Sequence, residues 1–122
     1  MSVLYTSTYS IAPGVDLTSA TAESINSAFA TAAGPNYPAD RDARLQEEIN
    51  EGVTISSNHC VILDRPNRKI INQRQYTTLE AAQSRESWII ANVPATLTDY
   101  SRDGIVLEED TEISERGYIT IN

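Results

Sequence analysis

The stretch from Asn58 to Ile90 constrains the fold more than any other part of the chain. It begins with a short apolar run, Cys60–Leu63, which has the length typical of a fully buried strand. A turn sequence follows at Asp64–Asn67, where proline presets φ and the Asp and Asn side chains can bond nearby backbone. An apolar pattern resumes at Ile70 and Ile71 and extends to Tyr76, so the two segments predict a β-hairpin with a loop of several residues.

A helix is predicted directly after this hairpin. Thr77 and Glu80 have the spacing of a capping box, in which each side chain bonds the other residue's backbone amide. Pro94 limits the helix, because proline disfavours helical backbone in the residue before it. The apolar face of this predicted helix consists of Leu79, Ala82 and Ile89.

Residues 3–11 alternate between two sets of side chains, which is the period of a β-strand. The first set is Val3, Tyr5, Ser7, Tyr9 and Ile11. The second set is Leu4, Thr6, Thr8 and Ser10, and is therefore nearly all hydroxyl. Because this second face is polar, we predict that residues 1–12 form an edge strand or an extended arm.

Two helices are predicted between residues 18 and 50. Ala22, Ile25 and Phe29 recur at helical spacing, and Gly34-Pro35 is a strong stop signal. After a loop over residues 34–39, a short helix runs to about Asn50 and carries few large apolar residues, so we expect it at the surface. Residues 53–56 are predicted to form a strand that leads into the hairpin.

After Pro94 the pattern is that of β-structure alone. Asp103-Gly104 is a strong hairpin signal, and further turn sequences near residues 110 and 116 predict a meander of three or four strands. The chain therefore reads as a single α+β domain over residues 1–122. Its mainly antiparallel sheet combines the N-terminal strand, the central hairpin and the C-terminal β-meander, packed with two to three helices.

Composition and charge argue against several classes of protein. The net charge of −8 disfavours nucleic acid and anionic membranes, because both require a positive protein surface. No apolar run approaches the ~18 residues that span a bilayer, and the N-terminus lacks the pattern of a secretory signal. One cysteine allows no intrachain disulfide. We therefore expect a cytoplasmic protein with no nucleic-acid and no membrane partner.

We find no motif for catalysis or cofactor binding in the sequence. His59 and Cys60 are adjacent, and adjacent strand residues point to opposite faces, so they cannot form a dyad or a metal pair. None of the five glycines has the spacing of a phosphate loop or a dinucleotide fingerprint. We expect no enzymatic activity, no cofactor, no metal site and no small-molecule substrate.

Two segments carry charge of opposite sign. Residues 99–116 hold seven acidic residues against two arginines, a net charge of −5, whereas residues 64–75 have a net charge of +3. The segments can pair within one molecule, face water, or join the basic turn of one copy to the acidic segment of the next. The last arrangement gives these predicted interface residues: Arg65, Arg68, Lys69, Glu108, Glu109, Asp110 and Glu112. Acidic oxygens can also hold a hard cation such as calcium, although the spacing is not that of an EF-hand loop.

Tyrosine dominates the aromatic residues, with six of the eight, and is enriched at protein interfaces. Tyr5, Tyr9 and Tyr37 complete the predicted interface. Tyr37 is the strongest single candidate, because it lies in a loop flanked by prolines.

These features favour a non-enzymatic structural or assembly protein that forms part of a larger homo-oligomeric particle. Its partners would be further copies of itself and other structural proteins. The composition is similar to that of small virion proteins of tailed bacteriophages, such as head decoration, neck or tail components. Two alternatives are a small acidic module that regulates a basic partner protein, and a small enzyme whose carboxylates converge only in the fold.

Overall fold

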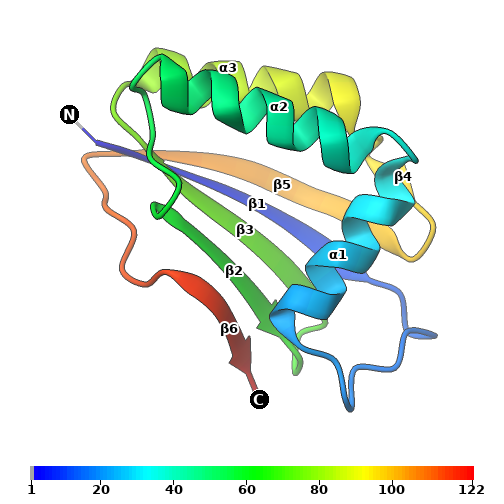
Figure 1. Ribbon diagram of the computed structural model, residues 1–122. Coiled ribbons are helices and arrows are strands. Elements are labelled where there is room, and N and C mark those ends of the chain that lie inside the picture. The colour runs from blue at the N-terminus through cyan, green and yellow to red at the C-terminus, as the bar shows by residue number, and fades with distance from the viewer. Residues whose placement is uncertain (1) are drawn as a thin grey trace.

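The computed structural model describes residues 2–122 and confirms the α+β class, with three helices and a six-stranded sheet within that range. The elements are β1 (Val3–Ile11), α1 (Ala22–Ala33), α2 (Tyr37–Asn50), β2 (His59–Asp64), β3 (Lys69–Tyr76), α3 (Leu79–Asn92), β4 (Thr96–Leu97), β5 (Tyr100–Glu109) and β6 (Gly117–Ile121). The three helices lie on the same side of the sheet (Figure 1).

The strand order is β4-β5-β1-β3-β2-β6. All neighbours are antiparallel except β2 and β6, which are parallel, so the sheet is mixed. The four long central strands, in the order β5-β1-β3-β2, alternate with helices in the β-α-β-β-α-β pattern of a split βαβ unit. The hairpin predicted from the stretch Asn58–Ile90 is confirmed as β2 and β3, joined at residues 65–68.

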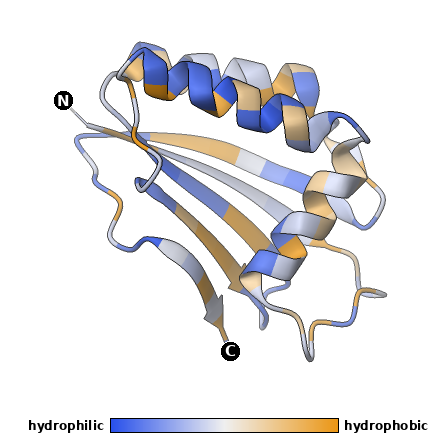
Figure 2. Ribbon diagram, in the orientation of Figure 1, coloured by the Kyte–Doolittle hydropathy of each residue, from blue (hydrophilic) through white to orange (hydrophobic). Residues whose placement is uncertain are grey.

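The core lies between the helices and one face of the sheet. Alternate residues of each strand point into it, and Val3, Val61, Leu63 and Ile70 are fully buried. On the helical side, α1 contributes Phe29, whose ring contacts Tyr9 and Tyr100 at centroid distances of 4.5 and 5.5 Å. In Figure 2, α2 is mostly hydrophilic, which agrees with the predicted surface position of this helix.

A buried ion pair ties α2 to α3 and to the sheet. The Arg85 guanidinium donates to Glu48 Oε1 at 2.8 Å and to the Tyr76 hydroxyl at 2.9 Å. The Tyr76 hydroxyl in turn donates to Glu48 Oε1 at 2.8 Å. Both charged side chains are almost fully buried, so the desolvation penalty of each charge is offset by the attraction of the other.

The prediction of an edge strand or arm at the N-terminus is wrong for the described residues. β1 lies in the middle of the sheet and pairs with β3 on one side and β5 on the other. Its hydroxyl residues Thr6, Thr8 and Ser10 point away from the helices, to the face of the sheet that no helix covers. The alternation of polar residues in β1 therefore arises because one face of the sheet has no covering helix, and not because β1 lies at an edge of the sheet.

The predicted C-terminal meander is also wrong. β5 continues through Asp103-Gly104 without a turn, because β1 pairs with β5 on both sides of this dipeptide. The register between the two strands shifts opposite Thr8 and Tyr9, where β5 forms a bulge. After β5 the chain crosses to the other edge of the sheet, where β6 lies parallel to β2. The Gln75 side chain holds this crossover by donating to the Thr111 carbonyl at 2.8 Å and accepting from the Ile113 amide.

Local predictions were shifted by a few residues. α3 ends at Asn92 as expected, but its N-cap is Thr78, whose hydroxyl accepts from the Ala81 amide at 3.2 Å, and not Thr77. The predicted strand at residues 53–56 is wrong, since this segment forms a loop before β2. Tyr37 is the first residue of α2 and does not lie in the predicted loop.

Within residues 2–122, no helix has the length and apolar character needed to cross a membrane.

Candidate functional sites

The two arginines of the basic turn donate to backbone carbonyls of the loop before α1. Arg65 donates to the carbonyl of Leu17 at 2.9 Å and also to that of Ala20. Arg68 donates to the carbonyls of Ala12 and Val15, each at 2.6 Å. The two arginines therefore hold the loop between β1 and α1 against the hairpin, although each also keeps partial exposure.

Lys69 also has partners within the chain. Its Nζ lies 2.6 Å from Asp103 Oδ2 and 2.7 Å from the Ser10 hydroxyl. Partial burial acts to raise the pKa of Asp103, but hydrogen bonds from Lys69 and Ser10 outweigh it and lower that pKa. One of the acidic residues of segment 99–116 is thus paired with the basic hairpin inside one molecule.

The remaining acidic candidates lie together at one end of the sheet. Glu108 and Glu109 end β5, and Asp110 and Glu112 follow in the crossover, all four exposed. Among the described residues, none of these four takes part in an ion pair. The predicted contact between them and a second copy's basic turn stays a prediction.

The three candidate tyrosines are buried in this structure. Tyr5, Tyr9 and Tyr37 lie between the helices and the sheet, where their rings contact the core and the pocket described below. They do not contribute to the outer surface that a second copy would meet.

The face of the sheet opposite the helices has no covering helix among the described residues. One row of side chains crosses it in register, from Thr8 on β1 to Ile71 on β3, Ile62 on β2 and Ile119 on β6. Val106 on β5 and Ile121 at the end of β6 extend this apolar surface and are 53% and 47% exposed. We call these six residues the open sheet face.

One end of this side of the sheet is already closed by the crossover. Ile113 packs there against Leu4 and Cys60, and all three are buried, with Ile62 and Ile119 at the margin of the cluster. The rest of the face has no such cover from the described residues. Partly buried Ile62, Ile71 and Ile119 therefore keep an apolar surface on the outside.

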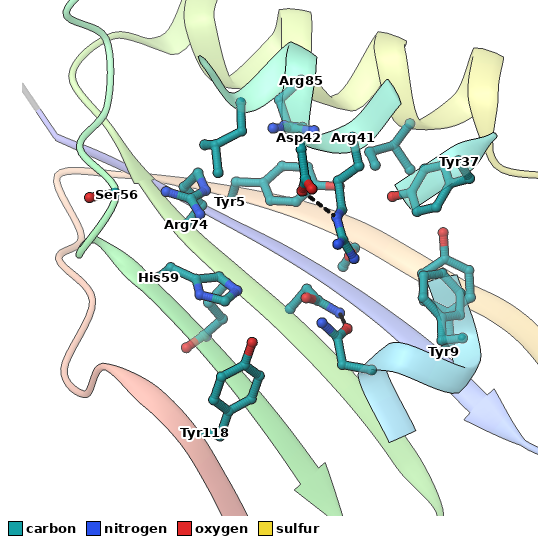
Figure 3. A pocket seen from close by; sticks show the side chains of 17 residues that line it. Tyr5, Tyr9, Tyr37, Arg41, Asp42, Ser56, His59, Arg74, Arg85 and Tyr118 are labelled. Carbon is teal, nitrogen blue, oxygen red and sulfur yellow. Dashed lines mark hydrogen bonds and ion pairs between the residues drawn. The ribbon is translucent and has the colours of Figure 1, made fainter. Parts of the chain in front are cut away.

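A pocket of about 280 Å³, lined by both polar and apolar side chains, lies on the other side of the sheet, beneath the helices (Figure 3). Its floor consists of two in-register rows of side chains on neighbouring strands. The first row is Tyr5, Arg74 and His59, and the second is Ser7, Asn72 and Tyr118. The helices supply the walls with Asn26, Phe29, Tyr37, Arg41, Leu45 and Ile89.

The electrostatics of the pocket are positive. Burial, followed by the nearby positive charges of Arg74 and Arg41, lowers the pKa of His59 to about 4, so its imidazole is neutral near pH 7. Arg41 is paired with Asp42 at 3.3 Å, and Arg85 with Glu48. No carboxylate of the described residues lies within ion-pair distance of Arg74, which is 9% exposed.

The pocket does not bring together the carboxylates of the enzyme alternative. Asp42 is the one carboxylate among its described lining residues, and it is bonded to Arg41. No group of three or more His, Cys, Asp or Glu residues within the described range is arranged to hold a metal ion. His59 and Cys60 point to opposite faces of the sheet, as predicted, with Cys60 in the cluster under the crossover.

The pocket residues were missed by sequence reasoning, although the sequence carries a signal for them. Ser7 shares the inward phase of β1 with Tyr5 and Tyr9, and Asn72 and Arg74 share that of β3 with Ile70. Polar residues at inward positions of a strand indicate either a buried network or a cavity.

No protein-family model matches the chain, and searches of curated proteins and of solved structures return no significant match.

Proposed function

We propose that the chain is a self-associating structural protein and that the open sheet face forms the contact between copies. The observation that supports this proposal is the in-register apolar row on a face with no covering helix. The three isoleucines of this row form an apolar strip that a second layer would bury, and the helices cover the other side of the sheet only.

The composition of the open sheet face suits contact with another sheet. Ile62, Ile71 and Ile119 are β-branched, and such side chains pack well on a pleated surface. Two copies stacked face to face would lie about 10 Å apart, with both rows interdigitated between them. The same patch would serve both partners, as in a two-fold interface, and this symmetry requires no second binding surface.

A pair of matched double variants tests the proposal. Val106→Glu with Ile121→Glu places two charges on the open sheet face, at positions that are about half exposed. Ile55→Glu with Ile90→Glu makes the same change at residues that are 55% and 59% exposed elsewhere. Multi-angle light scattering should give an oligomer for the wild type and the control, and a monomer for the open-face variant.

Two results would overturn the proposal. One is a wild type that stays monomeric at every concentration, and the other is an open-face variant with the mass of the wild type. Urea denaturation of both variants checks that each is folded before its mass is interpreted.

The predicted contact between basic turn and acidic segment needs a different variant. Charge reversal of Arg65 or Arg68 would also break their bonds to the loop before α1, so its outcome would be ambiguous. Glu109→Lys with Glu112→Lys changes exposed residues that have no ion-pair partner among the described residues. A reduced mass for this variant supports the charge-based contact, and an unchanged mass excludes it. The narrower proposal of a tailed-bacteriophage particle rests on composition, and co-purification from the native source tests it.

A further inference from the structure

The pocket beneath the helices contains a buried hydroxyl that has no partner. Tyr5 is 4% exposed, and its hydroxyl makes no hydrogen bond of normal geometry with any described residue, Ser7 included. Burial raises the pKa of Tyr5 well above its ordinary value, and Ser7 offsets only part of the rise, so the hydroxyl is protonated and free to donate. A buried polar group without a partner costs roughly 1–3 kcal/mol, which an acceptor in the pocket would recover.

The same pocket also holds a buried positive charge. Arg74 pairs with Tyr5 across β1 and β3, so both side chains stand in the same row on the same face. Its Nη1 donates to the Ile55 carbonyl at 3.0 Å, an interaction that brings no compensating charge. Arginine stays protonated in proteins, and a buried charge is stable only with a partner of opposite sign.

The contrast with Arg85 shows what Arg74 lacks. Both arginines are nearly buried under the same helices, but Arg85 has a carboxylate at 2.8 Å and a tyrosine hydroxyl at 2.9 Å. The corresponding groups for Arg74 would be an external carboxylate and the hydroxyl of Tyr5. Figure 3 shows Tyr5, Arg74 and His59 in the same pocket, with the Tyr5 ring and the Arg74 side chain extending in different directions.

The rest of the pocket fits a flat apolar body. Phe29, Leu45 and Ile89 come from three different helices, and Tyr9 and Tyr118 from the sheet. A volume of about 280 Å³ is near the lower end for ligand sites, so the occupant is small. Arg41 and Arg85 are already paired with carboxylates, so Arg74 offers a single free guanidinium, which matches a planar carboxylate better than a phosphate dianion.

We infer that this pocket binds a small organic monocarboxylate with an aromatic or similarly flat apolar body. Arg74 pairs with the carboxylate, the Tyr5 hydroxyl donates to it, and the neutral His59 ring completes the polar end. Phe29 and Tyr118 contact the apolar body. This inference does not depend on self-association, because the pocket and the open sheet face lie on opposite sides of the sheet.

The experiment uses a reporter that the sequence provides. His59 is the single histidine, so its ring protons are readily assigned by NMR. The probes are benzoate, phenylacetate and hexanoate, with neutral benzamide as the matched control. We expect saturable shifts of the His59 signals with a flat aromatic acid and none with benzamide. A bound anion should also raise the pKa of His59 from its low value, against the positive charges of Arg74 and Arg41.

Three variants separate binding from folding. Tyr5→Phe removes only the unpartnered hydroxyl, so the unliganded protein should be as stable as the wild type or more so, while affinity falls roughly tenfold. Arg74→Lys keeps the charge but loses the planar fork, and should also weaken binding. Tyr76→Phe removes a hydroxyl that is bonded to Glu48, and should lower stability without loss of affinity.

Each outcome bears on the inference. Failure of all three acids to shift His59 at concentrations up to about 1 mM would overturn it. Equal binding of benzoate and benzamide would remove the role of Arg74, and an unchanged affinity in Tyr5→Phe would remove that of Tyr5. Tighter binding of hexanoate than of the aromatic acids would contradict the flat apolar body.

Discussion

Removing one partner from the ion pair between Glu48 and Arg85 should be the most costly single change in this protein. The two side chains are 3% and 6% exposed, so Glu48→Leu leaves a guanidinium buried with no carboxylate. Breaking a buried pair in this way costs about 3–5 kcal/mol, because the remaining charge keeps its desolvation penalty. Typical domains are stable by about 5–15 kcal/mol, so the loss is a large fraction of the total.

The assay is urea denaturation followed by the fluorescence of Trp88. This is the single tryptophan, and the Arg85 guanidinium lies 5.3 Å from its ring centroid, so it reports directly on the site. The control is Arg44→Gln, which removes the partly exposed, 3.4 Å partner of the same carboxylate and should cost about 1 kcal/mol or less.

A triple variant tests the physical reason. Glu48→Leu, Arg85→Met and Tyr76→Phe together remove the three buried polar side chains of the network, and the remaining partner, Arg44, is partly exposed. Most of the lost stability should return, since apolar replacements of similar volume often match a buried pair. The reasoning is refuted if Glu48→Leu costs no more than Arg44→Gln, or if the triple variant is the least stable of all.

Three further predictions concern smaller effects. Thr78→Ala should lower the free energy of unfolding by about 1 kcal/mol through loss of the helix cap, whereas Thr77→Ala should change it little; equal effects would contradict the assignment of the cap. Gln75→Ala removes both side-chain bonds to the crossover, so amide hydrogen exchange in β6 should become faster while that in β1 does not. Because the pKa of His59 is lowered to about 4 from an ordinary 6.5, the unfolded chain takes up a proton before the folded one, and stability should fall as the pH drops from 6.5 to 4. That fall should amount to roughly 1–3 kcal/mol for a partly exposed group and should be largely absent in His59→Gln.

The stretch Asn58–Ile90 could be predicted because its signals are local. The apolar run before the turn, the turn itself and the end of α3 before Pro94 all depend on residues a few positions apart. The shift of the cap from Thr77 to Thr78 shows the limit of such signals, since both are threonines and the final choice depends on how α3 docks.

The arrangement of the C-terminal strands could not be predicted in the same way. β6 pairs with β2, which lies more than fifty residues earlier in the chain. The sequence of β6 contains no local signal that identifies β2 as its neighbour. The Asp103-Gly104 pair was misleading because its turn preference is worth less than the continuous pairing that β1 offers to β5.

The candidate sites also show the difference between local sequence signals and contacts that only the fold creates. Lys69 and Asp103 are residues whose charges the sequence made conspicuous, but only the fold shows that they pair with each other. The pocket needed the fold as well, because Tyr5, Arg74 and His59 come from three strands. The open sheet face was visible as alternation in β1, but was interpreted as an edge.

The most direct test of self-association is the solvent exposure of individual methyl groups. In one copy, the side chains of Val106 and Ile121 are about as exposed as that of Ile90 on α3. A soluble paramagnetic agent should therefore broaden all three methyl signals equally in dilute protein. At high protein concentration we predict that the Val106 and Ile121 signals become protected while that of Ile90 does not. Equal broadening of the three signals at every concentration would contradict the proposal that the open sheet face is covered by a second copy.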